Sequence, residues 1–150
     1  MIQSAAVDLQ SLSIQDKEKE KQRIVSLLSE FFANRDDIDA AILFGSFASG
    51  KFHEKSDIDI AIHSKSPLSY DTIAEIQVAL SLLCHREVDV ADLARAEGLF
   101  LHQIMTKGER IKFNHDVFHK YIMKALYFYE DFLPIQRACR AEAIRRMIHG

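Results

Sequence analysis

Two aspartates separated by a single residue, Asp57 and Asp59, are the strongest sign of chemistry in this sequence. They stand at the start of an apolar run, residues 58–62, that is typical of a buried strand. Residues two apart in a strand point the same way with Cα atoms about 6.5–7 Å apart, so both carboxylates should face one point. Two such charges about 4 Å apart repel by roughly 4 kcal/mol at an effective dielectric of 20, and a divalent cation would remove that cost. Hard oxygen ligands favour Mg²⁺ or Mn²⁺.

A turn of small residues precedes the aspartates. Gly45 and Ser46 follow a second apolar run, residues 40–44, which is also expected to be a strand. Glycine and serine are favoured in ordinary turns, so the pair alone has a plain structural explanation. Beside two carboxylates, however, the glycine lets the backbone approach a triphosphate, and N–H groups and the Ser46 hydroxyl can hold phosphate oxygens. The sequence therefore predicts a metal–phosphate site.

A partial P-loop pattern occupies the same segment. Gly45, four further residues, Gly50 and Lys51 follow a strand, as a P-loop should. The next residue is Phe52, where a P-loop needs a serine or threonine to bind magnesium. Residues 53–57 then lead into the next strand and leave no room for the helix that a P-loop requires. The P-loop interpretation is therefore rejected.

Gly45-Ser46, ten residues, and then Asp57-x-Asp59 resemble the signature of the DNA polymerase β-like nucleotidyltransferase superfamily. The resemblance covers residues 38 to about 112. Its best fit is to the minimal branch of that superfamily, the MNT proteins, which are small partners of HEPN-domain toxins. The resemblance implies a polymerase β-like nucleotidyltransferase fold.

Later segments are similar to the same family. It has a third acid in a later strand, and Asp89, within residues 87–93, stands in the matching place. Residues 99–111 are similar to the helix, glycine and strand that close the family core. One departure concerns the phosphates: many relatives carry arginine where this chain has Ser49. Lys51 is a candidate to supply the missing positive charge.

The resemblance implies a role for each site residue. Asp57, Asp59 and Asp89 would be the catalytic metal ligands of a two-metal phosphoryl transfer, with Asp89 also helping to deprotonate the acceptor hydroxyl. Gly45 and Ser46, with the lysine above, would bind the nucleotide. The alternative is structural, because ordinary half-exposed strands also alternate acidic and apolar residues. Two neighbouring strands that place acids on one face favour the metal site.

For MNT proteins the resemblance implies transfer of AMP from ATP, with Mg²⁺, to a hydroxyl of a cognate HEPN-type RNase toxin, with tyrosine as the expected acceptor. The chain would then be an adenylylating antitoxin in a hetero-oligomer with that toxin. Two alternatives stay open. One is a non-catalytic antitoxin that neutralises its partner by covering it. The other is a small-molecule nucleotidyltransferase of the aminoglycoside type, although the residues beyond the core leave little room for an acceptor-binding domain.

The composition fits this class of protein. A chain of 150 residues suits one domain, residues 1–150, with 48% hydrophobic and 27% charged residues. The net charge of −3 gives no general attraction to nucleic acid, so direct nucleic-acid binding is not expected. No apolar run is long enough to span a membrane. Two isolated cysteines without a signal peptide favour a reducing cytoplasm.

The order of helical and strand patterns predicts an α/β (α+β) layer fold, and the resemblance implies that it contains a small mixed β-sheet backed by helices. Its core is expected at about 36–113. An N-terminal helix is expected at about 14–33, after a loose arm at 1–12. C-terminal helices are expected at about 116–148, divided into two at Pro134 because proline breaks helices or starts them.

The remaining patterns in the C-terminal third favour ordinary structural explanations. His115 and His119 have metal-ligand spacing but no third ligand nearby, so we expect them to face solvent. The aromatic run at 118–129 covers too wide an arc for one buried face, and it serves the core and a partner surface equally well. The arginines near the C-terminus are expected to form a solvated last turn.

Overall fold

The computed structural model describes residues 13–149, with side chains described for all of these except residues 129–133 and 149. The arm predicted at 1–12 and the side chain of Tyr129 therefore lie outside the described residues. The elements follow in the order α2 (Ile14–Ala33), β1 (Ala40–Phe44), α3 (Ser46–Ser49), β2 (Ile58–His63), α4 (Tyr70–Cys84), β3 (Val88–Asp92), η2 (Leu93–Arg95), α5 (Gly98–Lys107), β4 (Glu109–Lys112) and α6 (His115–His149).

The strands form one mixed sheet in the order β3-β2-β1-β4. β1 pairs antiparallel with both β2 and β4, whereas β2 and β3 are parallel. Parallel neighbours need a crossover connection, and α4 provides it between β2 and β3. The predicted fold class, a small mixed sheet backed by helices, is confirmed.

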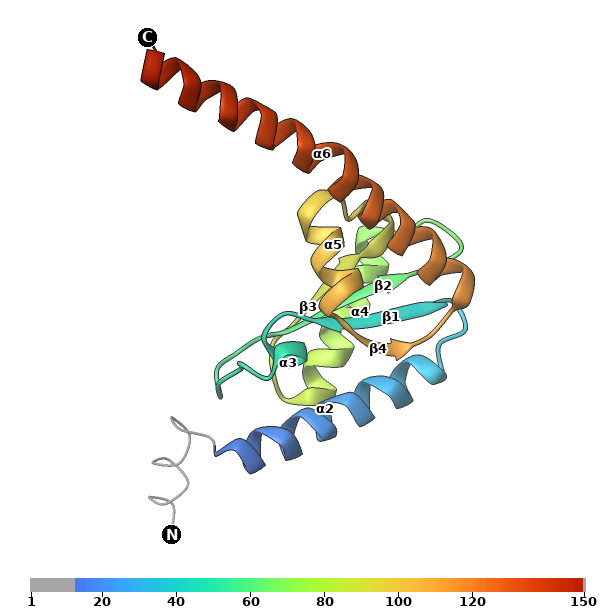
Figure 1. Ribbon diagram of the computed structural model, residues 1–150. Coiled ribbons are helices and arrows are strands. Elements are labelled where there is room, and N and C mark those ends of the chain that lie inside the picture. The colour runs from blue at the N-terminus through green and yellow to red at the C-terminus, as the bar shows by residue number, and fades with distance from the viewer. Residues whose placement is uncertain (1–12, 150) are drawn as a thin grey trace.

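Helices cover both faces of this sheet (Figure 1). Ile58, Ile60 and Ile62 of β2 pack into a core with buried residues of α2 and α4. Ala61, which points the other way, packs into a second core with residues of α5 and α6. Because side chains alternate along a strand, every odd-numbered position of β2 faces α5 and α6. That face carries Asp59.

The N-terminal helix has the predicted bounds and buries one stripe of apolar residues. Its first turn is capped by Ser13, whose hydroxyl accepts a hydrogen bond from the backbone N–H of Asp16. Ile24, Leu28 and Phe32 recur every four residues and are fully buried against the sheet. Lys21 of this helix donates to the carbonyl of Ala48 in α3 at 3.2 Å, which ties the helix to the turn after β1.

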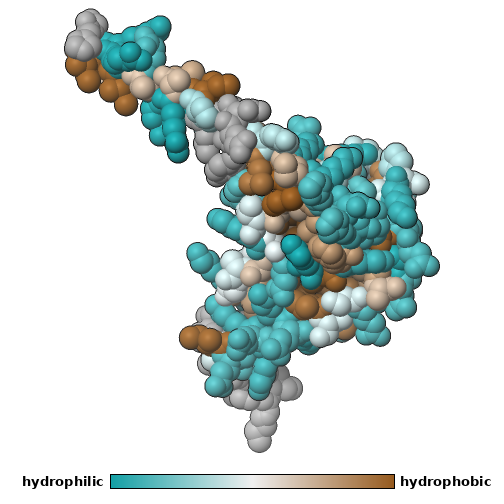
Figure 2. Space-filling view, turned by 45° about the vertical axis from the view of Figure 1, so that its right-hand side comes forward, coloured by the Kyte–Doolittle hydropathy of each residue, from teal (hydrophilic) through white to brown (hydrophobic). Residues whose placement is uncertain are grey.

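The prediction of two C-terminal helices is wrong, because α6 runs unbroken from His115 to His149 through Pro134. A proline inside a helix loses one hydrogen bond and crowds the carbonyl four residues earlier. The residues that follow include Ala138, Ala141 and Ala143, which are strong helix formers and keep the helix going. Residues 134–148 are all exposed, and this end of α6 projects from the body of the molecule (Figures 1 and 2).

The histidines and aromatic residues of the C-terminal third differ in exposure. His115 and His119 are exposed on α6, as predicted. The aromatic run is divided, because Tyr121 is buried in the second core whereas Tyr127 is 56% exposed. Within the described residues, no helix combines the length and apolar character that crossing a membrane requires.

Candidate active site

Asp59 and Asp89 lie side by side on neighbouring strands. β2 and β3 pair in parallel with Asp59 directly opposite Asp89, and paired strands are about 4.8 Å apart. Val88 and Val90 flank Asp89 and belong to the core beneath α2 and α4. The Asp89 side chain therefore points to the opposite face, the one that Asp59 shares. The structure thus brings two of the three predicted acids together.

Asp57 immediately precedes β2 and is exposed, as is Asp89, whereas Asp59 is half-buried. Burial raises the pKa of the Asp59 carboxyl, and the negative charges of Asp89 and Asp57 raise it further. All three acids therefore share one electrostatic environment. Burial and repulsion by neighbouring like charges both favour the protonated form of a carboxyl.

The donor set suits a hard divalent cation, which three carboxylates would neutralise. Within residues 13–149, no three acidic, histidine or cysteine side chains are already closed around a common point as a metal cage. Asp57 and Asp89 are exposed, and in the described part of the chain no hydrogen bond fixes either carboxylate. Their side chains can therefore turn toward Asp59. The register of β2 and β3 and the negative charge of Asp59 are the features that make this group of acids fit a divalent metal.

Gly45 is required at the end of β1 for two separate reasons. Its backbone has φ 73° and ψ −149°, a conformation that essentially only glycine adopts. In addition, a Cβ atom at this position would lie 2.5 Å from Oδ2 of Asp59. Phe44, the preceding residue, pairs across the sheet with the same aspartate. The glycine predicted to admit a phosphate therefore also makes room for a carboxylate of the site.

The turn that follows is a single helical turn, α3, bounded by two glycines. The N–H of Ser49 donates to the carbonyl of Gly45 at 3.1 Å, and the N–H of Lys51 donates to the carbonyl of Ser46 at 3.1 Å. Gly50 closes the turn with φ 77°. Lys51 is exposed, and its role toward phosphate stays a prediction. The chain is not helical after this lysine, which excludes a P-loop.

Aromatic stacking and local hydrogen bonds shape the loop that leads to Asp57. The rings of Phe47 in α3 and Phe52 stack at 4.0 Å between centroids and 8° between planes, and both are buried. The N–H of His53 donates to Oγ of Ser56 at 2.8 Å, and the N–H of Ser56 donates to the carbonyl of His53 at 3.0 Å. The turn and the loop are thus joined before the chain enters β2.

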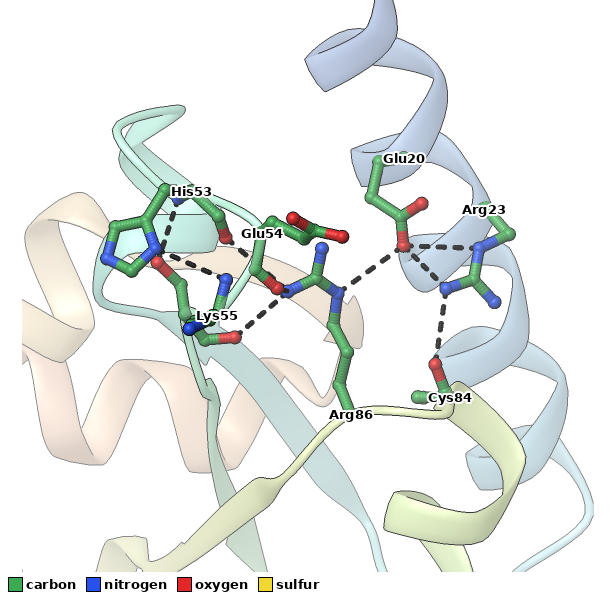
Figure 3. Close-up of polar contacts among 8 residues, drawn as sticks. Glu20, Arg23, His53, Glu54, Lys55, Cys84 and Arg86 are labelled. Carbon is green, nitrogen blue, oxygen red and sulfur yellow. Dashed lines mark hydrogen bonds and ion pairs between the residues drawn. The ribbon is translucent and has the colours of Figure 1, made fainter. Parts of the chain in front are cut away.

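Arg86 is a residue of this region that the sequence patterns did not single out. Its guanidinium reaches the loop from the junction of α4 and β3 (Figure 3). There it donates hydrogen bonds to backbone carbonyls of the loop, including those of Glu54 and Ser56. The only hint in the sequence was its place three residues before Asp89, which does not reveal contacts to a loop thirty residues away.

Comparison with known proteins places this fold and site in a family. The family model for polymerase β nucleotidyltransferases matches residues 27–116, which is more than half of the chain and spans the turn and all three acids. The chain therefore belongs to the polymerase β nucleotidyltransferase family.

Individual relatives are more narrowly defined. The protein adenylyltransferase MntA of Shewanella oneidensis is 32% identical over 93 residues, which are 61% of this chain and 63% of that protein. The match thus spans less than two thirds of the relative. A chain from a toxin–antitoxin crystal structure with AMP-PNP aligns with a TM-score of 0.64 and 24% identity over 83% of this chain and 98% of that one. A chain from the complex of tri-AMPylated Shewanella oneidensis HEPN toxin with MNT antitoxin aligns with a TM-score of 0.59 and 21% identity, over 85% of this chain and 98% of that one.

Proposed function

We propose that this chain transfers AMP from ATP, with Mg²⁺, to a hydroxyl group of a HEPN-domain toxin, and that it acts in this way as an antitoxin. The observation that carries the proposal is the pairing of Asp59 with Asp89 beside Gly45. The relatives support the choice of substrate and acceptor. One is named a protein adenylyltransferase, one comes from a toxin–antitoxin structure with AMP-PNP, and one comes from the complex of a tri-AMPylated HEPN toxin with MNT antitoxin.

Each residue of the candidate site has its own proposed role in the transfer. Asp57, Asp59 and Asp89 would hold divalent metal, which neutralises charge on the transferred phosphoryl group and on the leaving oxygen. Gly45 lets the backbone approach the triphosphate, and the Ser46 hydroxyl donates a hydrogen bond to a phosphate oxygen. The acceptor hydroxyl oxygen bonds to the α-phosphorus, its proton passes to the Asp89 carboxylate, and the bond to the β-phosphate breaks to release pyrophosphate.

The position of Asp89 in the sheet supports a protein as acceptor. Among the described strands, β3 lies at the edge of the sheet and pairs with β2 alone. Asp89 is exposed on that strand. A hydroxyl on the surface of a docked protein can therefore reach Asp89 from outside the sheet, without a separate domain to enclose a small acceptor.

The test is the intact mass of a HEPN-domain toxin encoded beside this chain's gene, after incubation with the chain, ATP and Mg²⁺. We expect the toxin to gain the mass of one AMP group or a multiple of it. Asp57→Asn, Asp59→Asn and Asp89→Asn should each abolish the gain. The matched control is Asp36→Asn, which neutralises an exposed acid before β1, at the end of that strand away from Gly45. This variant should retain the gain in mass. A toxin that stays unmodified by the natural chain would overturn the proposed activity. Full modification by the three variants would overturn the site.

A second candidate, neutralisation of the toxin by binding alone, is favoured by one observation. The projecting end of α6 exposes Ile144, Met147 and Ile148, which lie on neighbouring positions of the helix. Exposed apolar residues of this kind are typical of contacts with a partner. The same mass measurement separates the two candidates, because binding alone predicts a toxin that is inhibited but carries no AMP.

A further inference from the structure

Arg86 occupies a nearly buried position at the junction of α4 and β3. It follows His85, whose left-handed conformation with φ 53° ends α4 and turns the chain toward the next strand. The Arg86 side chain is only 11% exposed. A charged side chain is rarely buried to this extent unless its hydrogen-bonding groups are satisfied.

The guanidinium is satisfied largely by the loop that leads into Asp57. Nη1 of Arg86 donates to the carbonyls of His53 at 3.4 Å, of Glu54, and of Ser56 at 3.1 Å. The carbonyl of Ser56 belongs to the peptide group that joins it to Asp57. Holding this carbonyl therefore fixes the backbone from which the Asp57 side chain enters the site.

The same guanidinium also touches the turn at the end of β1. Its central carbon lies 5.0 Å from the centre of the Phe47 ring, close enough for a cation–π contact. Phe47 is the residue after Ser46 in α3, and its ring also stacks on Phe52. One side chain thus contacts both segments of the site, the turn proposed for phosphate and the loop that carries an acid.

Glu20 of α2 orients the guanidinium from the opposite side (Figure 3). Oε1 of Glu20 lies 3.6 Å from Nε of Arg86, and the same oxygen pairs with Arg23. Burial would raise the pKa of the Glu20 carboxyl, but hydrogen bonds and charges from Arg23 and Arg86 outweigh it and hold that pKa below its usual value. The carboxylate is therefore ionised at neutral pH and balances the buried charge of Arg86.

We infer that Arg86 is a positioning residue of the transfer reaction. It fixes the place of Asp57 through the loop carbonyls and couples that place to the turn through Phe47. The inference rests on the proposed function, because it assigns Arg86 to the metal site through Asp57. Residues that orient metal ligands without touching the metal typically change metal affinity 10- to 100-fold when replaced.

The chain offers graded variants at this position. Arg86→Gln removes the charge and leaves the loop carbonyls with a single weaker donor group. Arg86→Lys keeps a charge that can reach those carbonyls, but it has no planar group to stack on Phe47. Arg23→Gln is the matched control, since Arg23 also pairs with Glu20 yet donates to the carbonyl of Cys84 rather than to the loop.

The experiment measures Mn²⁺ binding to the full chain by electron paramagnetic resonance, with thermal unfolding recorded for every variant. We expect Arg86→Gln to weaken Mn²⁺ binding about tenfold or more, Arg86→Lys to recover part of that loss, and Arg23→Gln to leave the affinity unchanged. In an Asp57→Asn background, Arg86→Gln should cause no further loss, because a residue that acts through Asp57 has nothing left to position.

The possible results separate this inference from the function on which it rests. Unchanged Mn²⁺ affinity in folded Arg86→Gln, or equal losses with and without the Asp57 carboxylate, would show that Arg86 stabilises the fold only and overturn the inference. If Arg86→Gln does not fold, the same comparison with Arg86→Lys decides between these outcomes. Absence of Mn²⁺ binding by the natural chain would instead count against the metal site of the proposed function.

Discussion

Replacing Asp59 by asparagine should stabilise the metal-free protein, although it removes a central residue of the site. Asparagine has nearly the same size, so the change removes a charge and leaves packing against Gly45 intact. Burial and the charges of Asp89 and Asp57 raise the pKa of Asp59 in the folded state. A raised carboxyl pKa means that the ionised form is less stable in the folded chain than in the unfolded one.

The sign of the pH dependence follows directly. Below the pKa of the unfolded chain, near 3.8, the carboxyl is protonated in both states and imposes no penalty. The penalty grows as pH rises from the pKa of the unfolded chain through the higher pKa of the folded state, and it is complete above the latter. The advantage of Asp59→Asn should therefore be greatest near pH 7 and shrink as the pH falls toward 4.

The strand spacing sets the size of the effect. Charges on paired strands about 4.8 Å apart repel by roughly 3.5 kcal/mol at an effective dielectric of 20 and by about 0.9 kcal/mol in bulk water. Because Asp89 is exposed, the lower end applies, at about 1 kcal/mol. For a chain of this length that corresponds to a rise in melting temperature of about 2–4 °C.

The assay is thermal unfolding in EDTA and then in excess Mg²⁺ or Mn²⁺. In EDTA the Asp59→Asn variant should melt above the natural chain. In excess metal the natural chain should gain stability, by about 2.7 kcal/mol at one hundred times the dissociation constant, and the variant should gain little. Asp36→Asn, at an exposed site away from the cluster, should change neither melting temperature. An Asp59→Asn variant that melts several degrees lower in EDTA would refute the reasoning, because it would show that favourable contacts hold this carboxylate.

Three further outcomes are expected. Gly45→Ala should cost at least about 1–3 kcal/mol in stability and abolish AMP transfer, whereas Gly50→Ala, with a similar φ but no neighbour within 4 Å, should cost about 1 kcal/mol and keep activity. Urea unfolding measures the stability of both variants, and the mass assay measures their activity. Equal activity of the two variants would contradict the reasoning. In the folded chain Cys139 should react with a thiol reagent, whereas Cys84 should not, because it is buried and burial raises its pKa. A colorimetric titration should therefore count one fast-reacting thiol, and two fast-reacting thiols would be inconsistent with the burial of Cys84. Removing residues 134–150 should change the melting temperature by less than about 2 °C, since residues 134–148 are exposed, and a larger loss would show that this segment packs on the body.

The periodicity of the sequence was enough to predict most helices and strands and the positions of two aspartates of the candidate site. Strand alternation placed Asp59 and Asp89 on faces that the register of β2 and β3 then brought together. The bounds of the first helix were predicted correctly, because a helix cap and a buried stripe are local features. What depends on neighbours along the chain was accessible to sequence reasoning.

Features that depend on distant segments were not accessible. The close approach of the Asp59 carboxylate to Gly45 is a contact across two strands, and nothing near either residue announces it. Arg86 carries no motif, and its partners are backbone carbonyls, which every sequence has. Pro134 shows the opposite failure, because a valid local rule predicted a break that the surrounding helix formers overrode.

The proposed metal site has two opposing requirements, and these explain the positions of its glycine, its acids and its arginine. Metal binding needs negative charges close together, yet burial and the charges of Asp89 and Asp57 raise the pKa of Asp59, so the ionised carboxylate is destabilising in the metal-free chain. The compensation comes from segments outside the cluster. Gly45 gives the Asp59 carboxylate room, and the partly buried Arg86–Glu20 pair contacts the loop without placing a positive charge among the acids. A lysine or arginine within the cluster would relieve the same repulsion but would compete with the cation. On the proposed function, the positive charge of Arg86 on backbone carbonyls next to Asp57 would hold that carboxylate in place and leave its oxygens available to the metal.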